Sequence, residues 1–183
     1  TEKYGPLECE AVLHATGRRA NTEGLGLENT DIELRPNGTI VVDEFCQTAV
    51  ENVFAVGDVN GGLQFTYVSL DDFRVVNGYL HGNKEYTTAD RKNVPYSTFI
   101  SPALSHVGLH KEEAEAAYPN VAVASLPVAN MPRGAVNQDP RGLFRVTVDK
   151  DTNLILGATL FGKNSEEIIN LIKMAIDNKI PYT

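Results

Sequence analysis

Apolar and polar residues alternate with a period of two in several short stretches of the chain, which is the pattern of half-buried β-strands. In the C-terminal half, this pattern predicts strands at residues 96–100, 106–109, 121–128, 143–148 and 154–161. The last two are separated by a polar turn, so we expect them to pair as an antiparallel hairpin. The C-terminal half is therefore predicted to be α+β with an antiparallel sheet.

Three segments are predicted to form helices. Residues 66–80 carry apolar residues at helical spacing, and Gly82 is expected to end that helix. Residues 111–118 are predicted to form a short acidic helix. Residues 165–178 are amphipathic, and the apolar side chains that share one face are Ile168, Ile169, Ile172, Ala175 and Ile176.

The N-terminal half is predicted to contain strands in addition to its long helix. Residues 10–16 and 53–56 are expected to be strands. Residues 32–42 are expected to form a hairpin, because Asn37-Gly38 suits the positive φ angles of a tight turn.

A change in composition marks a boundary between the two halves. Residues 82–93 are polar and charged without apolar periodicity, and Pro95 restricts the backbone of the residue before it. We therefore expect one domain over residues 1–92 and a second over residues 93–183.

Composition and charge narrow the class of protein. The chain has 183 residues, 42% of them hydrophobic, which is ordinary for a globular protein with a buried core. Its formal net charge of -8 provides no broad basic surface, so we expect no nucleic-acid partner. No apolar run is long enough to cross a bilayer, and the N-terminus lacks the apolar stretch of a secretory signal. We expect a soluble, cytoplasmic protein without a membrane partner.

The two cysteines do not suggest a reactive centre. Cys9 and Cys46 are too far apart for a redox pair and match no zinc pattern. We expect structural or free thiols in a reducing compartment, and no metal site.

Candidate chemistry lies at the ends of two predicted strands. Residues 15–21 read ATGRRAN, and residues 53–59 read VFAVGDV. In the second motif, Gly57 lets another molecule approach the backbone, and Asp58 offers a carboxylate at the carboxyl end of the strand. Open α/β sheets bind their ligands at such strand ends.

These motifs, in this order, resemble the second FAD-domain segment of the pyridine nucleotide-disulfide oxidoreductases, the family of glutathione reductase, lipoamide dehydrogenase and mercuric reductase. Residues 94–108 and 141–179 are similar to the interface domain of that family. Residues 61–72, GGLQFTYVSLDD, look most like its reactive-chlorine-resistance branch, flavoproteins that reduce copper(II). The resemblance implies an α/β plus α+β fold: the C-terminal segment of an FAD-binding Rossmann-like domain, followed by an interface domain cut short at its C-terminus.

The resemblance also implies a function. The full enzyme would pass a hydride from NAD(P)H to FAD, and then electrons to a cysteine pair or an onward acceptor. It would be a homodimer held together through residues 93–183. We expect the chain by itself to contain no catalytic residue and to show no turnover. A different class of function stays open, in which the chain is a folded dimerisation module whose flavin residues are idle.

The cofactor contacts that the resemblance implies are Gly17, Gly57, Asp58, Phe65 and Thr66. Asp58 would hold a ribityl hydroxyl of FAD, although a turn aspartate that caps local amides is the alternative. Gly17 would lie near FAD or would serve only the geometry of its turn. Thr66 would start a helix whose positive end faces the flavin pyrimidine ring, or it would be a plain N-cap.

Other motifs favour structural interpretations. Gly24 and Gly26 lie in a glycine-containing loop that lacks the third glycine of a dinucleotide fingerprint. His106 and His110 are four residues apart, but the predicted strand would separate their side chains widely, so we expect surface or interface histidines. His14 is expected to be a hydrogen-bonded histidine in a buried strand.

Overall fold

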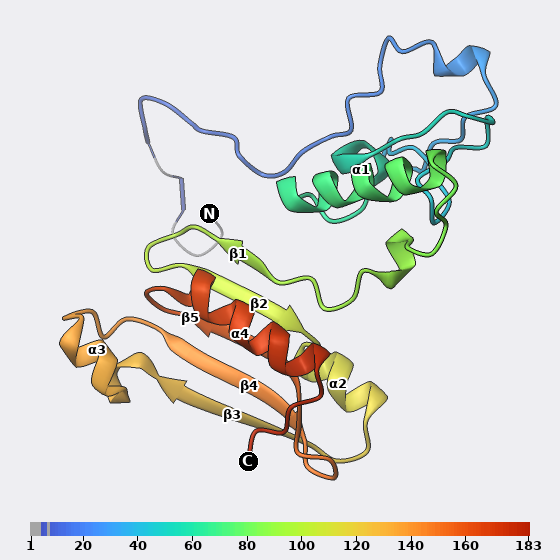
Figure 1. Ribbon diagram of the computed structural model, residues 1–183. Coiled ribbons are helices and arrows are strands. Elements are labelled where there is room, and N and C mark those ends of the chain that lie inside the picture. Colours follow the sequence, from blue (N-terminus) through green and yellow to red (C-terminus); the bar gives the residue numbers. More distant parts are fainter. Residues whose placement is uncertain (1–4, 7) are drawn as a thin grey trace. The chain divides into compact units, whose positions relative to one another are not determined.

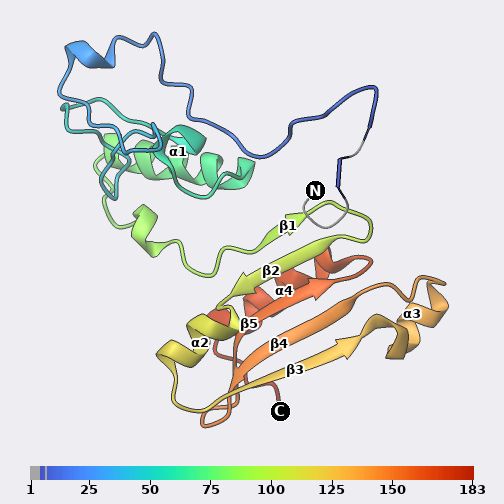
Figure 2. The same ribbon diagram turned by 180° about the vertical axis from the view of Figure 1, so that it is seen from behind.

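The chain divides into two compact units, Thr1–Asp90 and Arg91–Thr183. The structure is a computed structural model that describes residues 5, 6 and 8–183. Figures 1 and 2 show its helices and strands from opposite sides, and each unit is described by itself below.

An antiparallel sheet forms the framework of the second unit. Its five strands, in the spatial order β1-β2-β5-β4-β3, are all antiparallel to their neighbours. They are β1 (Tyr96–Thr98), β2 (Leu104–Gly108), β3 (Val121–Pro127), β4 (Leu143–Asp149) and β5 (Leu154–Phe161). The antiparallel sheet predicted from the alternation is confirmed, as is the β4–β5 hairpin.

Helix α4 (Ser165–Asp177) covers β2 and β5 and closes the core. The fully buried members of that core are Val107, Ala158, Leu160 and Ile169. The helix ends where Lys179 adopts a φ of 52°, and the Ile180 N–H then donates to the carbonyl of Ala175. The amphipathic pattern of residues 165–178 is thus confirmed as a helix whose apolar face packs on the sheet.

Two shorter helices lie at opposite ends of the sheet (Figures 1 and 2). Helix α2 (Lys111–Ala117) begins after His110, whose backbone N–H donates to Glu113 Oε2. Helix α3 (Pro132–Val136) was not foreseen, because five residues are too few for an apolar period. A Cβ at Gly134 would lie 2.4 Å from the carbonyl oxygen of Val128, which explains the glycine there.

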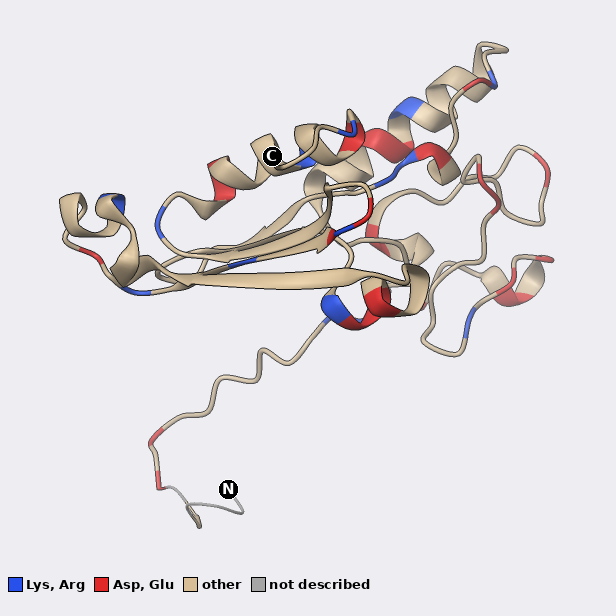
Figure 3. Ribbon diagram, turned by 90° about the horizontal axis from the view of Figure 1, so that it is seen from below, with Lys and Arg blue, Asp and Glu red and all other residues tan. Residues whose placement is uncertain are grey.

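The strands carry little charge. Arg145 and Asp149, both in β4, are the charged residues of the five strands. Figure 3 shows Lys, Arg, Asp and Glu concentrated on helices and loops, while the strands are largely tan. Among the described helices, none is both long and apolar enough to traverse a bilayer.

The first unit is built around helix α1 (Thr66–Leu80), as its apolar spacing predicted. Gly82 follows with a φ of 78°, and its N–H donates to the carbonyl of Tyr79, which ends the helix as expected. The remaining elements are the single-turn 3-10 helices η1 (Leu27–Asn29), η2 (Gly57–Asn60) and η3 (Thr88–Asp90). Ile40, Cys46, Ala55, Val68 and Val75 are the buried apolar residues.

The expectations for the first unit have different outcomes. The hairpin predicted over residues 32–42 is confirmed: Leu34 and Ile40 form an antiparallel bridge, the Arg35 N–H donates to the Thr39 carbonyl, and Gly38 has a φ of 81°. The strand expected over residues 53–56 is reduced to a bridge between Phe54 and Gln47.

The strand expected over residues 10–16 is a correction. Within the described part of the chain, residues 10–16 pair with no other segment, and Val12 and Leu13 are 83% and 90% exposed. A strand is stabilised by its neighbours in a ladder. A segment without such neighbours therefore stays extended but unpaired.

Candidate cofactor site

Gly57 makes the turn that presents Asp58. Val56 is still extended, with φ −121° and ψ 153°, and Gly57 then adopts a φ of 73° as η2 begins. A Cβ at position 57 would lie 2.7 Å from Ser69 Oγ on α1. Both the left-handed backbone and the contact with α1 therefore require glycine.

Asp58 is an exposed carboxylate held by Arg18. Arg18 Nη1 donates to Asp58 Oδ2 over 2.7 Å, and the aspartate side chain is 46% exposed. This ion pair brings together the two sequence motifs. Gly17, next to Arg18, has a φ of 132° and open space where a Cβ would lie. Sequence reasoning missed the role of Arg18, because nothing in the spacing indicated which residue would meet Asp58.

A second carboxylate supports the same turn from inside. Asp72 on α1 is 1% exposed, and its Oδ2 accepts the Gly57 N–H over 2.8 Å and Asn60 Nδ2–H over 2.9 Å. Sequence reasoning missed this residue too. The sequence feature that could have revealed it is an acidic residue on the same buried face of the predicted helix as Val68 and Val75.

Phe65 and Thr66 lie at the N-terminus of α1. Phe65 is extended, and its carbonyl accepts the N–H groups of Val68 and Ser69, each over 3.0 Å. The N-cap position is Phe65 rather than Thr66, and it makes no side-chain capping bond. The interpretation of Thr66 as a plain N-cap is therefore wrong. The rings of Phe65 and Tyr67 stack at 5.3 Å with an interplanar angle of 3°.

The site therefore has an exposed carboxylate on one element and the N-terminus of an α-helix on the next. The carboxylate can accept hydrogen bonds from hydroxyl groups. The first amides of a helix lack carbonyl partners within it, and its dipole favours negative charge there. This donor and acceptor set fits a ligand that carries hydroxyl groups and an electron-rich edge.

The histidine interpretations need correction. His106 is 5% exposed, and its ring stacks on that of His110 with centroids 3.8 Å apart, so the pair is neither widely separated nor wholly at the surface. Gly108, with a φ of 77°, ends β2 between them and breaks the alternation of the strand. Burial lowers the pKa of His106. His14 is exposed and outside any strand, although His14 Nε2 lies 2.7 Å from Thr16 Oγ1.

His106 shows no sign of being a metal ligand. Its Nδ1 lies 2.8 Å from Thr159 Oγ1 and its Nε2 lies 3.0 Å from the carbonyl of Gly108, so both ring nitrogens already have protein partners. Among the described residues, no three His, Cys, Asp or Glu side chains lie close enough together to hold a metal ion. Cys9 is exposed and Cys46 is buried, and no disulfide joins them.

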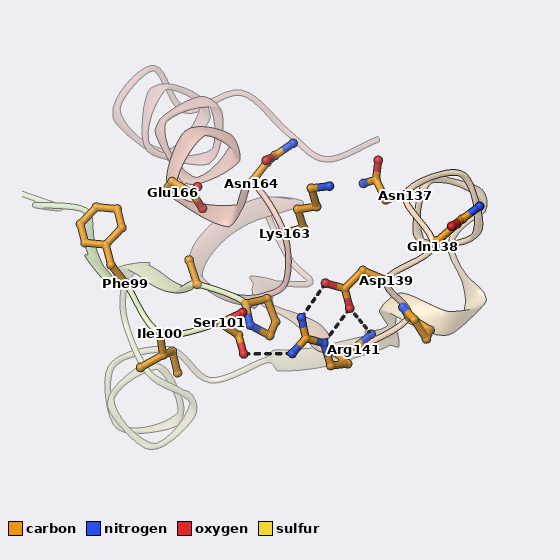
Figure 4. Close-up of a pocket in the computed structure, with 13 residues that line it drawn as sticks. Phe99, Ile100, Ser101, Asn137, Gln138, Asp139, Arg141, Lys163, Asn164 and Glu166 are labelled. Atoms are coloured by element: carbon orange, nitrogen blue, oxygen red, sulfur yellow. Dashed lines mark hydrogen bonds and ion pairs between the residues drawn. The ribbon is translucent and has the colours of Figure 1, made fainter.

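The second unit has a cavity of about 740 Å³ beside the start of α4 (Figure 4). Arg141 and Asp139 form a two-pronged ion pair at its edge, with Nε to Oδ1 and Nη2 to Oδ2 both 2.8 Å. The hydrogen bonds from Arg141 lower the pKa of Asp139 to about 2. Lys163 and Glu166 also line the cavity, and Glu166 Oε2 is buried without a hydrogen-bond partner in the described structure.

Comparison with known proteins agrees with this arrangement. Residues 1–72 match the pyridine nucleotide-disulphide oxidoreductase family, and residues 94–183 match the dimerisation domain of the same family. The chain is 45% identical over 181 residues to the probable pyridine nucleotide-disulfide oxidoreductase RclA of Escherichia coli K12, and this covers 99% of the chain and 41% of that protein. It is 35% identical to the glutathione reductase of Burkholderia cepacia, over 93% of the chain and 38% of that enzyme.

A solved structure shares the fold. The HOCl-induced flavoprotein disulfide reductase RclA from Escherichia coli matches with a TM-score of 0.86 at 46% identity, over 92% of this chain and 39% of that chain. The chain thus spans about two fifths of the length of these relatives. The order of the motifs, the antiparallel sheet and both family matches show that the chain belongs to the pyridine nucleotide-disulphide oxidoreductase family.

Proposed function

We propose that the chain supplies part of the FAD site and the dimer interface of a flavin-dependent oxidoreductase that uses NAD(P)H. One observation carries the cofactor assignment: Asp58 is exposed at the end of an extended segment and is held by Arg18 of the other motif. The solved RclA, which shares this fold at 46% identity, is a flavoprotein disulfide reductase. The predicted domains, residues 1–92 and residues 93–183, would then be an FAD-domain segment and an interface domain.

Bound FAD would supply the hydride-accepting chemistry, and residues of this chain would hold it. Asp58 would accept a hydrogen bond from a ribityl hydroxyl, and Arg18 would fix the orientation of the carboxylate. Gly57 would keep the backbone of the turn free of a side chain. The first turn of α1, which begins at Thr66, would stabilise negative charge on the reduced cofactor, with Phe65 beside it.

NAD(P)H is proposed as the hydride donor, and the cytoplasm as the location. The family name specifies pyridine nucleotide as a reactant. Cys9 and Cys46 are not joined by a disulfide, which supports a reducing compartment.

A homodimer through the second unit is the other half of the proposal. Residues 94–183 match a dimerisation domain. Leu126, Leu171 and Met174 are 47%, 62% and 54% exposed, so β3 and α4 present apolar side chains that a second copy would cover. The alternative function, a dimerisation module without flavin, shares this surface but leaves the Arg18–Asp58 pair without a role.

The visible spectrum of the whole protein tests the proposal. We expect the purified protein to show flavin absorbance bands that bleach when NADH or NADPH is added without oxygen. A colourless protein that takes up no FAD and still dimerises would support the alternative instead.

A further inference from the structure

Asp72 is a buried carboxylate that the proposed cofactor contacts do not use. It lies on α1 with 1% of its surface exposed. Burying a charged group is costly unless hydrogen bonds compensate it. Two of the donors to Asp72, the Gly57 N–H and Asn60 Nδ2, belong to η2.

The bonds of Asp72 fix the turn that carries Asp58. Gly57 donates its backbone N–H to Asp72 Oδ2 over 2.8 Å, and Gly57 immediately precedes Asp58. Asn60 donates through Nδ2 to the same oxygen over 2.9 Å and to the carbonyl of Ala55 over 3.3 Å. One carboxylate oxygen thus holds the turn on both sides of Asp58.

The same residue belongs to the helix whose N-terminus forms the other part of the proposed site. Helix α1 begins at Thr66, less than two turns before Asp72. Ser69, between them, sets how closely η2 can approach, because a Cβ at Gly57 would lie 2.7 Å from its Oγ. The turn and the helix are therefore joined by hydrogen bonds and by close contact.

We propose that Asp72 is a positioning residue of the flavin site, which holds the turn carrying Asp58 against α1 so that Asp58 and Thr66 reach a single cofactor. The inference rests on the proposed FAD site. It predicts that the carboxylate of Asp72 sets flavin affinity and the flavin environment without touching the cofactor.

The test compares Asp72→Asn with Asp71→Asn in the whole protein. Asparagine keeps the size of Asp72 but removes its negative charge, so the two hydrogen bonds to its oxygen lose their charge assistance. Asp71 is the adjacent carboxylate, and it accepts from the Tyr86 hydroxyl over 3.1 Å. Apoprotein is titrated with FAD, and the absorbance maximum of the bound flavin is recorded.

We expect Asp72→Asn to raise the Kd for FAD roughly tenfold or more and to shift the flavin absorbance maximum. Asp71→Asn should leave the Kd within about twofold of the wild type and the absorbance maximum unchanged. Asn60→Ala removes a donor to Asp72 and should raise the Kd by a smaller factor, which keeps the test valid if Asp72→Asn does not fold.

The inference is overturned if folded Asp72→Asn and Asn60→Ala proteins bind FAD with wild-type affinity and spectrum, even when the apoproteins unfold at lower temperature. If Asp58→Asn still weakens FAD binding in that case, the proposed FAD site survives and only the role of Asp72 fails. A wild-type protein that takes up no FAD would overturn both.

Discussion

Arg18 Nη1 lies 2.7 Å from Asp58 Oδ2, and this ion pair joins sequence motifs that are 40 residues apart. Both side chains are exposed, at 63% and 46%, so solvent weakens the pair and its contribution to folding is small. Its importance is geometric, because a carboxylate that already has one partner is oriented before a ligand arrives.

Replacing Arg18 should weaken cofactor binding more than it weakens folding. Arg18→Gln removes the donor to Asp58, and we expect the Kd of the whole protein for FAD to rise by a few fold, equivalent to about 1 kcal/mol. Arg19→Gln is the matched control, because it removes the same charge at the neighbouring position. FAD titrations should give a higher Kd for Arg18→Gln than for Arg19→Gln. An equal rise in Kd for both variants would show that only the local positive charge matters.

Gly57→Ala should destabilise the first unit. The added Cβ must occupy a backbone with φ 73° and would lie 2.7 Å from Ser69 Oγ, so we expect a loss of about 1–3 kcal/mol in the free energy of unfolding. Gly24→Ala has φ 76° and open space around the Cβ, so it measures the backbone cost alone. Urea unfolding should show a larger loss for Gly57→Ala, and Ser69→Ala should recover part of the difference.

We expect the Asp139 carboxyl to titrate unusually because it is paired with Arg141. Because Arg141 lowers the pKa of Asp139 to about 2, the carboxyl should stay ionised well below the ordinary range of an aspartate. A lowered pKa stabilises the folded state above the unfolded pKa, and this contribution is lost as the pH falls through the folded pKa. An NMR titration of the Asp139 carboxyl carbon checks the midpoint. In Arg141→Gln the midpoint should rise toward 3.8, and an unchanged midpoint would contradict the assignment.

Helix α4 should show different roles for its two faces. Ile169 is 2% exposed in the core against the sheet, so Ile169→Ala should lower the free energy of unfolding by about 2–5 kcal/mol. Leu171 is 62% exposed, so Leu171→Ala should change it by less than about 0.5 kcal/mol in a monomeric state. Chemical unfolding at low protein concentration measures the free energy of unfolding of both variants. Similar losses of stability in the two would mean that the assigned faces are wrong.

The proposed dimer makes a separate prediction for the exposed face. Leu171→Glu should weaken self-association at least tenfold, because an unpaired charge would be buried between subunits. Lys150→Glu, a charge change in the turn between β4 and β5, is the control. Sedimentation over a range of concentrations measures both, and a dimer unaffected by Leu171→Glu would place the interface elsewhere.

The sequence predicted the second unit better than the first, for a physical reason. The β4–β5 hairpin and α4 follow from local alternation and from an apolar stripe, and the two strands of the hairpin are neighbours in the sequence. Residues 10–16 are also predicted to be a strand, but in the described chain no neighbouring strand completes a ladder. The spacing of apolar residues predicts the conformation of a segment. Whether a strand pairs depends on which other segments lie beside it in the fold.

The candidate site shows the same limit. Gly57 and Asp58 could be identified from their place after an apolar run, because turn chemistry is local. Arg18 and Asp72 could not be assigned to them, since these contacts join distant positions and depend on the tertiary fold. His106 and His110 were misjudged for a similar reason: the positive φ of Gly108 ends the strand and lets the rings stack.

The most direct test of the central claim is the affinity of the whole protein for FAD in Asp58→Asn, with Asp43→Asn as the control. Asp43 is a turn aspartate whose Oδ1 accepts the N–H groups of Phe45 and Gln47, so its loss should affect stability alone. Asp58→Asn should weaken FAD binding by about 1–2 kcal/mol, or roughly tenfold, while the fold persists. If Asp58→Asn instead behaves like Asp43→Asn, with wild-type FAD affinity and a less stable apoprotein, Asp58 is a turn residue and the flavin assignment is wrong.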